Sequence, residues 1–277
     1  MSAQIHIRIA LLLSLAILSI APLQASENTK NPAQATSPDP GITAHEAAAA
    51  SGQFLMVLFQ KTDDPSPLRE SFDAVRQSMA GDLMSVIINT ENPGESGLVN
   101  RCNVRWAPLP MVVILAPNSA VTRSFRTAFT QDQVRTAFLS PVSQECLLAF
   151  QQRKIVFVCV QGNATSDNDK AMEGVTRFKE DPKLGRIAQV VMIDPDDPRE
   201  RDLLTQLRIG ANPAVAETLL LAPPGKLLGK WTGATSKEAF TQTLIAQAGS
   251  QQTCQVPGCQ DPSCPTPPAS PAQGGAQ

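Results

Sequence analysis

One arrangement of apolar segments occurs twice along this chain of 277 residues, and an internal repeat constrains the architecture before any single residue is interpreted. In the first copy, an apolar run at 54–59 is followed by a helical stretch, a strand-like segment at 83–89, a short helix, and a strand at 110–115 that opens with a proline. The second copy repeats this order, with strand-like segments at 155–160, 188–194 and 218–222. The repeat predicts two domains of the same kind.

The apolar runs predict an α/β architecture. Every residue of 54–59 and of 155–160 is apolar, which is typical of a central strand covered on both faces. Strands that alternate with helices favour a mostly parallel sheet between helices, and each copy closes with a strand, a tight turn and a return strand. The prediction is a mixed sheet flanked by helices in each domain.

Two helix starts are predicted from capping residues. Thr43 and Glu46 form the spacing of a capping box ahead of an alanine-rich run. In the second copy, Asp197 suits a helix cap, Pro198 the first helical position and Glu200 the reciprocal partner of a capping box. This interpretation explains the acidic cluster at 194–200 better than a metal site does, because each acidic group has a backbone donor to satisfy.

The order of elements resembles the thioredoxin superfamily over residues 43–246, twice over. The resemblance implies two tandem thioredoxin-like domains, which we place at 42–140 and 141–248. It also implies that a proline at the start of the third strand is cis and faces the active-site loop. Pro110 matches that position well, and Pro213 matches it less well because residues 214–217 look inserted before the strand resumes.

The departure from the superfamily is at the catalytic loop, where thioredoxins carry CxxC. Those positions hold Asp64, Pro65, Ser66 and Pro67 in the first copy, and Thr165, Ser166, Asp167 and Asn168 in the second. Dithiol exchange needs a thiolate at a helix N-terminus and a resolving thiol about one turn away. Neither loop has a cysteine, so this chemistry is excluded for the two domains.

Other catalytic chemistry is also not expected in the domains. Beyond the first 25 residues the chain has a single histidine, His45, so a serine nucleophile lacks a nearby base and a zinc site with several histidines is excluded. Glycine-rich phosphate loops are missing from the sequence. Ser66 and Ser166 are interpreted as helix-start residues. We therefore expect no catalytic residue and no cofactor.

The first 25 residues read as a cleaved signal peptide. His6 and Arg8 precede an apolar run at 9–20, which ends near a small-residue site, so cleavage is expected after Ala25 or Ser26. The run is shorter than the about 20 residues that cross a bilayer, and no later segment is long and apolar enough. We expect a periplasmic or secreted protein with no transmembrane segment after signal cleavage, and a flexible leader at 26–41.

Charge and composition limit the partners. The formal net charge is −2 and the chain has no basic block, which argues against nucleic acid as a partner. Residues 249–277 are rich in Gln, Pro, Gly and Ser and cannot bury enough apolar surface to fold alone. This segment is expected to be a disordered tail.

The six cysteines divide into two groups. Cys102, Cys146 and Cys159 lie in the predicted domains and are interpreted as packing residues. The tail holds three more at equal spacing: Cys254, Cys259 and Cys264. Oxidising compartments favour a disulfide or a cross-link to a partner, and soft-metal binding (Cu or Zn) or no selected role are the alternatives.

The function expected from these observations is non-catalytic protein binding, with other envelope or secreted proteins as partners. The resemblance implies a groove beside the proline loop that holds an extended polypeptide, lined here by Trp106, Leu109, Pro110 and the loop at 64–67, with a weaker counterpart at Asn212 and Pro213. Trp106 is equally compatible with packing between a helix and the sheet. A thiol-disulfide oxidoreductase that works through the tail cysteines, or metal binding by the tail, are the alternative functions.

Overall fold

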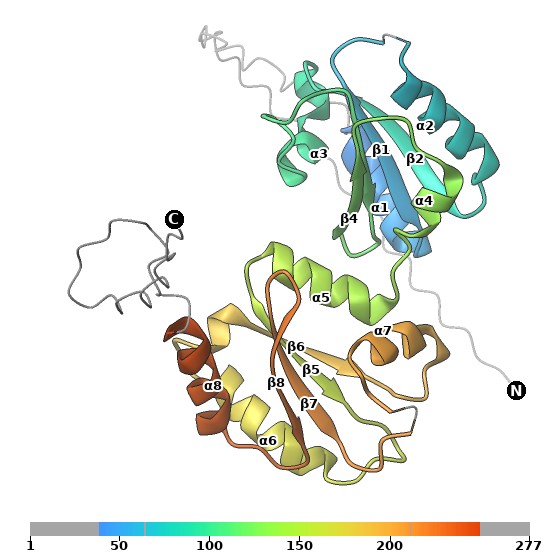
Figure 1. The fold of residues 1–277 in the computed structure, drawn as a ribbon. Coiled ribbons are helices and arrows are strands. Elements are labelled where there is room, and N and C mark those ends of the chain that lie inside the picture. The colour runs from blue at the N-terminus through green and yellow to red at the C-terminus, as the bar shows by residue number, and fades with distance from the viewer. Residues whose placement is uncertain (1–38, 64, 211, 250–277) are drawn as a thin grey trace, which may run out of the picture. The chain divides into compact units, whose positions relative to one another are not determined.

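The computed structural model describes residues 39–63, 65–210 and 212–249, which form two four-stranded sheets with helices on both faces of each (Figure 1). The predicted signal peptide, leader residues 26–38, Asp64 and the three tail cysteines lie outside the described residues. Among the described helices, none combines the length and the apolar character that crossing a membrane requires.

The first domain is built from the following elements: α1 (Pro40–Ser51), β1 (Phe54–Gln60), α2 (Pro67–Ser78), β2 (Leu83–Asn89), η1 (Pro93–Glu95), α3 (Ser96–Arg101), β3 (Met111–Leu115), β4 (Val121–Phe125) and α4 (Gln131–Arg135). The second domain repeats them as α5 (Pro141–Gln151), β5 (Ile155–Val160), α6 (Asn168–Lys179), η2 (Gly185–Ile187), β6 (Ala188–Ile193), η3 (Pro198–Glu200), α7 (Arg201–Gln206), β7 (Glu217–Ala222), β8 (Lys226–Thr232) and α8 (Lys237–Gly249).

Both sheets have the same strand order and register. The order is β2-β1-β3-β4 in the first sheet and β6-β5-β7-β8 in the second. In each, the central strand pairs parallel with one neighbour and antiparallel with the other, and a hairpin adds the fourth strand. The predicted mixed sheet flanked by helices is confirmed.

The central strand of each sheet is buried on both faces, as the apolar runs predict. All seven residues of β1 are buried, and their side chains alternate between two cores. Met56 and Leu58 pack with α2 and α4, whereas Leu55 and Val57 pack with α1 and α3. The face of α2 that carries Phe72, Val75 and Met79 is buried against the first of these cores.

The repeat extends to the ends of helices. The residue after α1 is Gly52, with φ 69°, and the residue two positions after α5 is Arg153, with φ 58°. Asn103 after α3 and Arg208 after α7 are likewise left-handed, with φ 52° and 55°. Left-handed residues of this kind end helices and turn the chain into the next segment. The two domains therefore share local backbone geometry even where the residue types differ.

The first helix starts earlier than the sequence predicts. α1 begins at Pro40, inside the predicted leader 26–41, and its cap is Asp39, whose Oδ1 accepts from the backbone N of Gly41 at 2.8 Å and of Ile42 at 3.0 Å. Thr43 lies within the helix, so the predicted capping box of Thr43 and Glu46 is wrong. An aspartate cap followed by proline satisfies the free N–H groups one turn earlier.

The acidic turn of the second copy is only partly as predicted. Asp197 does cap η3, accepting from the backbone N of Arg199 at 2.9 Å, with Pro198 in the first position. Glu200 does not complete a capping box. It is 1% exposed, and its carboxylate accepts from the Ser140 hydroxyl and from the backbone N of Val142, at the start of α5. The donors to this buried carboxylate thus come from the start of α5 and not from its own helix.

Candidate functional site

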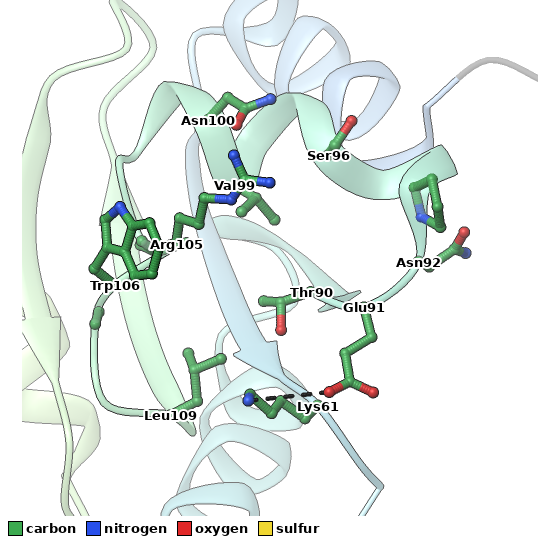
Figure 2. Close-up of a pocket in the computed structure, with 13 residues that line it drawn as sticks. Lys61, Thr90, Glu91, Asn92, Ser96, Val99, Asn100, Arg105, Trp106 and Leu109 are labelled. Carbon is green, nitrogen blue, oxygen red and sulfur yellow. Dashed lines mark ion pairs between the residues drawn. The ribbon is translucent and has the colours of Figure 1, made fainter.

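A pocket in the first domain lies where the C-terminal ends of β1 and β2 meet α3 and the loop before β3 (Figure 2). Its volume is about 740 Å³. The lining residues are Lys61, Thr90, Glu91, Asn92, Pro93, Ser96, Val99, Asn100, Val104, Arg105, Trp106, Ala107 and Leu109. Ligands of open α/β sheets bind outside the carboxyl ends of strands, so this position is suited to a binding site.

One wall of the pocket is formed by the residues that follow β2, and local hydrogen bonds hold these residues in place. The Asn92 side chain accepts from the backbone N of Gly94 at 3.0 Å and donates to Glu95 Oε1 at 2.8 Å, which fixes the turn into η1. Lys61 Nζ lies 4.0 Å from Glu91 Oε1 across the pocket floor (Figure 2). Both side chains are largely exposed, so the ion pair contributes little to stability and is free to exchange for a ligand.

Trp106 faces solvent at the edge of this pocket. It is 87% exposed, so the alternative in which it packs between helix and sheet is wrong. Figure 2 shows Arg105, from the same loop, directed toward α3 at Val99. A large exposed indole beside a pocket is a typical anchor for a bound partner, because it has much apolar area to bury.

A second pocket of about 490 Å³ adjoins the first and reaches Pro110. It shares Lys61, Ala107 and Leu109 with the first pocket and adds Gln60, Thr62, Ser66, Pro108 and Pro110. The Leu109–Pro110 peptide bond is cis. Because the two pockets share lining residues, we treat them together as the Trp106 groove, which lies between residues 60–62 with Ser66 on one side and the loop at 104–110 on the other.

The loop from β1 to α2 is held by its own polar contacts. Arg69 contacts Asp63 and donates to Asp73 Oδ2 at 2.8 Å, and the Gln60 amide donates to Asp63 Oδ1 at 3.2 Å. These bonds to Gln60 and Arg69 lower the pKa of Asp63. The Ser66 hydroxyl accepts from the backbone N of Arg69 at 3.2 Å, which confirms Ser66 as the cap of α2. Pro67 is the first residue of that helix and Pro65 is exposed.

In the second domain, the loop before α6 and the loop before β7 pair with each other. The backbone N of Ser166 donates to the Ala214 carbonyl at 2.9 Å, and the backbone N of Ala216 donates to the Ser166 carbonyl at 2.9 Å, so Ser166 and Val215 form a parallel bridge. The Ser166 hydroxyl also donates to the Ala214 carbonyl at 3.0 Å. Ser166 is therefore not a helix cap, and the N-cap of α6 is Asp167, with φ 60°. Thr165, the residue before Ser166, is buried, and its hydroxyl donates to the side chain of Asn168, the first residue of α6.

The register shows how the second proline loop differs. Phe59 lies opposite Met111, the first residue of β3, and Val160 lies opposite Glu217, the first residue of β7. The residue before β3 is Pro110, whereas the residue before β7 is Ala216, and Pro213 comes earlier in the loop. Asn212–Pro213 is not among the cis bonds of the described residues. The pocket next to Asn212 has a volume of about 260 Å³, well below that in the first domain.

Strand order, register and helix placement are the same in both domains and agree with the arrangement that the sequence led us to expect. Each domain therefore has the strand order and pairing directions that are expected of a thioredoxin-like fold. No family model matches the chain, and a search of curated proteins gives no match.

Three solved structures are similar to the chain at low identity. The zinc-bound form of human ERp44 matches with 12% identity and a TM-score of 0.30, over 74% of this chain and 58% of that one. Form I of ERdj5 matches with 12% identity and a TM-score of 0.28, over 77% and 27% of the two chains. The bb fragment of ERp72 matches with 11% identity and a TM-score of 0.29, over 78% and 99%. The chain thus spans less than two thirds of the ERp44 and ERdj5 chains.

Cys146 and Cys159 are buried in the cores of the second domain, and Cys102 is half-buried against a core of the first. Burial raises the pKa of Cys102 to about 11, and the pKa values of Cys146 and Cys159 to about 12. None of the three forms a disulfide with another described residue. Thiols with pKa values this high carry almost no thiolate at neutral pH, which fits packing residues.

His45 is not positioned to serve either loop. It is buried on α1, where its Nδ1 lies 2.9 Å from Arg101 Nη1 and its Nε2 lies 3.1 Å from the Ser119 hydroxyl. Burial, followed by the Arg101 charge, lowers the pKa of His45. The ring ties α1 to α3 and to the turn before β4, which is a structural role.

Sequence reasoning missed Lys61, Arg105 and Asn92 as groove residues. Nothing in their local pattern distinguishes them from ordinary loop residues. The available signal was topological: Lys61 and Asn92 follow the two predicted parallel strands, whose carboxyl ends meet at one edge of the sheet.

Proposed function

We propose that this chain is a non-catalytic binding protein, exported from the cytoplasm, whose first thioredoxin-like domain holds an extended segment of another envelope or secreted protein. The proposal is carried by one contrast between the two copies. The Trp106 groove is open beside Pro110 in the first domain, whereas Ser166 pairs with Val215 at the corresponding loops of the second, where the pocket next to Asn212 has only about 260 Å³.

The second domain also illustrates the mode of binding that the first can offer. There, residues just before the third strand of the sheet pair with an extended segment through backbone hydrogen bonds. In the first domain the backbone of Leu109 has no hydrogen-bond partner among the described residues. Unpaired backbone groups at a strand end are suited to pair with an added strand, and flanking pockets supply side-chain specificity.

Trp106 is the expected anchor of the complex. Tryptophan is enriched among the few residues that dominate binding energy, because it buries a large apolar area and keeps one donor. With Leu109 and Pro108 beside it, the exposed ring forms an apolar strip next to the polar pocket. A non-catalytic role is supported by the absence of cysteine from both loops and by the raised pKa values of the three domain thiols.

The test is a peptide array read with quantitative titrations. Overlapping peptides from exported proteins are probed with the labelled full chain, and the dissociation constants of the peptides that bind are measured by fluorescence anisotropy. Trp106→Ala is expected to weaken binding about 10- to 100-fold, as the loss of an interface hot spot does. The matched control is Asn212→Ala in the pocket of the second domain, for which the dissociation constant stays within about twofold of the parent.

Trp106→Ala is expected to fold normally because the side chain is exposed, so equal melting temperatures separate a binding defect from unfolding. The proposal is overturned if the array peptides bind the Trp106→Ala variant as tightly as the parent, or if Asn212→Ala is the variant that abolishes binding.

A further inference from the structure

The sequence beyond α8 contains regularly spaced prolines, a pattern that is typical of the proline-rich segments that bind to other proteins. Prolines occur at every third position over one stretch: Pro262, Pro265, Pro268 and Pro271. The polyproline II helix has three residues per turn, so in that conformation the four rings share one edge. Pro257 and Pro267 fall outside this period.

The Trp106 groove has the features that bind such an edge. Proline-rich segments dock in aromatic-lined grooves, where rings pack on indole faces and the unpaired carbonyls of the ligand accept from donors in the groove. Trp106 is exposed, and its indole N–H has no hydrogen-bond partner among the described residues. Pro108, Leu109 and Pro110 continue the apolar wall from the indole toward β3.

Charge also favours the match. Asp261, directly before the first of the four prolines, is the one charged side chain between positions 250 and 277. The groove carries the cations Lys61 and Arg105 against the single carboxylate of Glu91, and both cations line the same pocket (Figure 2). The acidic residue at one end of the segment therefore has complementary positive charges among the groove residues.

We propose that residues 261–271 of this chain are a ligand of the Trp106 groove, bound as a polyproline II segment with its proline edge on Trp106. This inference rests on the proposed function, since an external polypeptide would use the same groove and compete with the segment. Competition lowers the apparent affinity for the external ligand in proportion to the fraction of free groove. The tail thus regulates access to the site.

The two tryptophans of the chain make a direct test possible. The full chain is labelled with ¹⁵N-tryptophan, and its two indole resonances are assigned with Trp231→Phe. Trp231 packs edge-on against Phe240 in the second domain, with 4.9 Å between the ring centroids. Its resonance therefore serves as an internal reference. The test variant replaces Pro262, Pro265, Pro268 and Pro271 with alanine, and the matched control replaces the out-of-period Pro257 and Pro267.

The test variant is expected to move the Trp106 resonance by more than its linewidth and to leave the Trp231 resonance unchanged, whereas the control variant moves neither. Peptides that bind the parent are expected to bind the test variant about tenfold more tightly if the segment fills nine tenths of the groove. Coincident Trp106 resonances in the parent and the test variant would overturn the inference.

The outcomes also separate the two proposals. Peptide binding that depends on Trp106, together with an unmoved Trp106 resonance, removes the tail as a ligand and leaves the proposed function standing. A shifted Trp106 resonance without binding of any external peptide removes the proposed function and leaves the tail as the occupant. All six substitutions lie beyond residue 249, so they change none of the core residues of the part of the chain that the structure describes.

Discussion

At the scale of single residues, the three domain cysteines differ from reactive thiols because burial opposes the charged form. With pKa values of about 11 and 12, at most about one thiol in a thousand is ionised at pH 8, against about a quarter of an unperturbed cysteine. We expect Cys102, Cys146 and Cys159 of the folded chain to react with iodoacetamide at least about 100-fold more slowly than in denaturant.

The measurement is alkylation of the reduced chain at pH 8, followed by peptide mass spectrometry, and the same sample in denaturant is the control. A domain cysteine that reacts in the folded chain at its denatured rate would contradict a packing role for that residue.

His45 gives the protein a pH dependence whose sign follows from its contacts. Arg101 can only donate, so Nδ1 is the acceptor and the neutral ring is the form that fits. Protonation of His45 would direct its Nδ1–H at the N–H of Arg101 Nη1 and would place two positive charges side by side. Because the folded pKa of His45 lies below its ordinary value of 6.5, the unfolded chain takes up the proton first. The contribution of His45 to the free energy of unfolding is therefore fully present above pH about 6.5, and it is lost as the pH falls through the folded pKa.

The comparison is urea unfolding of the parent and His45→Gln between pH 7.5 and 5.0. The difference between the two slopes is at most about 1.4 kcal/mol per pH unit, because one group binds one proton. Parallel stability curves over this range would show that His45 does not titrate as its contacts require.

At the scale of elements, close approach of α6 to the segment before α8 depends on a glycine. A Cβ added to Gly174 would lie 1.8 Å from the Thr235 carbonyl oxygen, which belongs to the backbone and cannot move independently. Gly174→Ala is expected to reduce the free energy of unfolding by about 1–3 kcal/mol despite the better helix propensity of alanine, because overpacking displaces the backbone.

The matched control is Gly81→Ala, where an added Cβ has no atom within 4 Å, and its expected effect is within about 0.5 kcal/mol. Chemical denaturation of both variants checks the prediction. Equal stability of the Gly174→Ala variant and the parent would mean that α6 and the Thr235 segment are not packed this closely.

Elements were predictable from the sequence where a physical signal was local. The strands at 54–59 and 155–160 are apolar at every position, and a strand buried on both faces leaves few other structures for such runs. The start of α1 was missed because two capping signals lay close together, and the Asp39–Pro40 signal prevailed over the one at Thr43.

The site was less predictable because it depends on distant contacts and on register. The exposure of Trp106 depends on how tightly its loop packs on α3, and the loop sequence does not encode that. The pairing of Ser166 with Val215 joins segments about 50 residues apart in sequence, and long-range pairing leaves no local pattern. The sequence placed Pro110 directly before a strand and indicated an insertion at 214–217 after Pro213, and in the structure Ala216 stands directly before β7.

At the scale of the whole molecule, the repeat is symmetric in fold, and we propose that it is asymmetric in function. The strand orders match, and so do the left-handed residues that end the helices. The second domain satisfies the backbone of its proline loop internally, whereas the first leaves a groove open beside an exposed tryptophan. In our account the second domain supports the protein structurally and the first domain binds the partner.

Hydrogen exchange of the full chain with and without a bound peptide tests this division most directly. An array peptide at saturating concentration is expected to slow exchange of the Trp106 and Leu109 amides at least about tenfold, since a paired amide exchanges only when the complex opens. The amides of Ser166 and Ala216 are expected to be protected equally with and without peptide, because they are already paired. Protection that appears at Ser166 and Ala216 while the Leu109 amide stays unchanged would contradict the account.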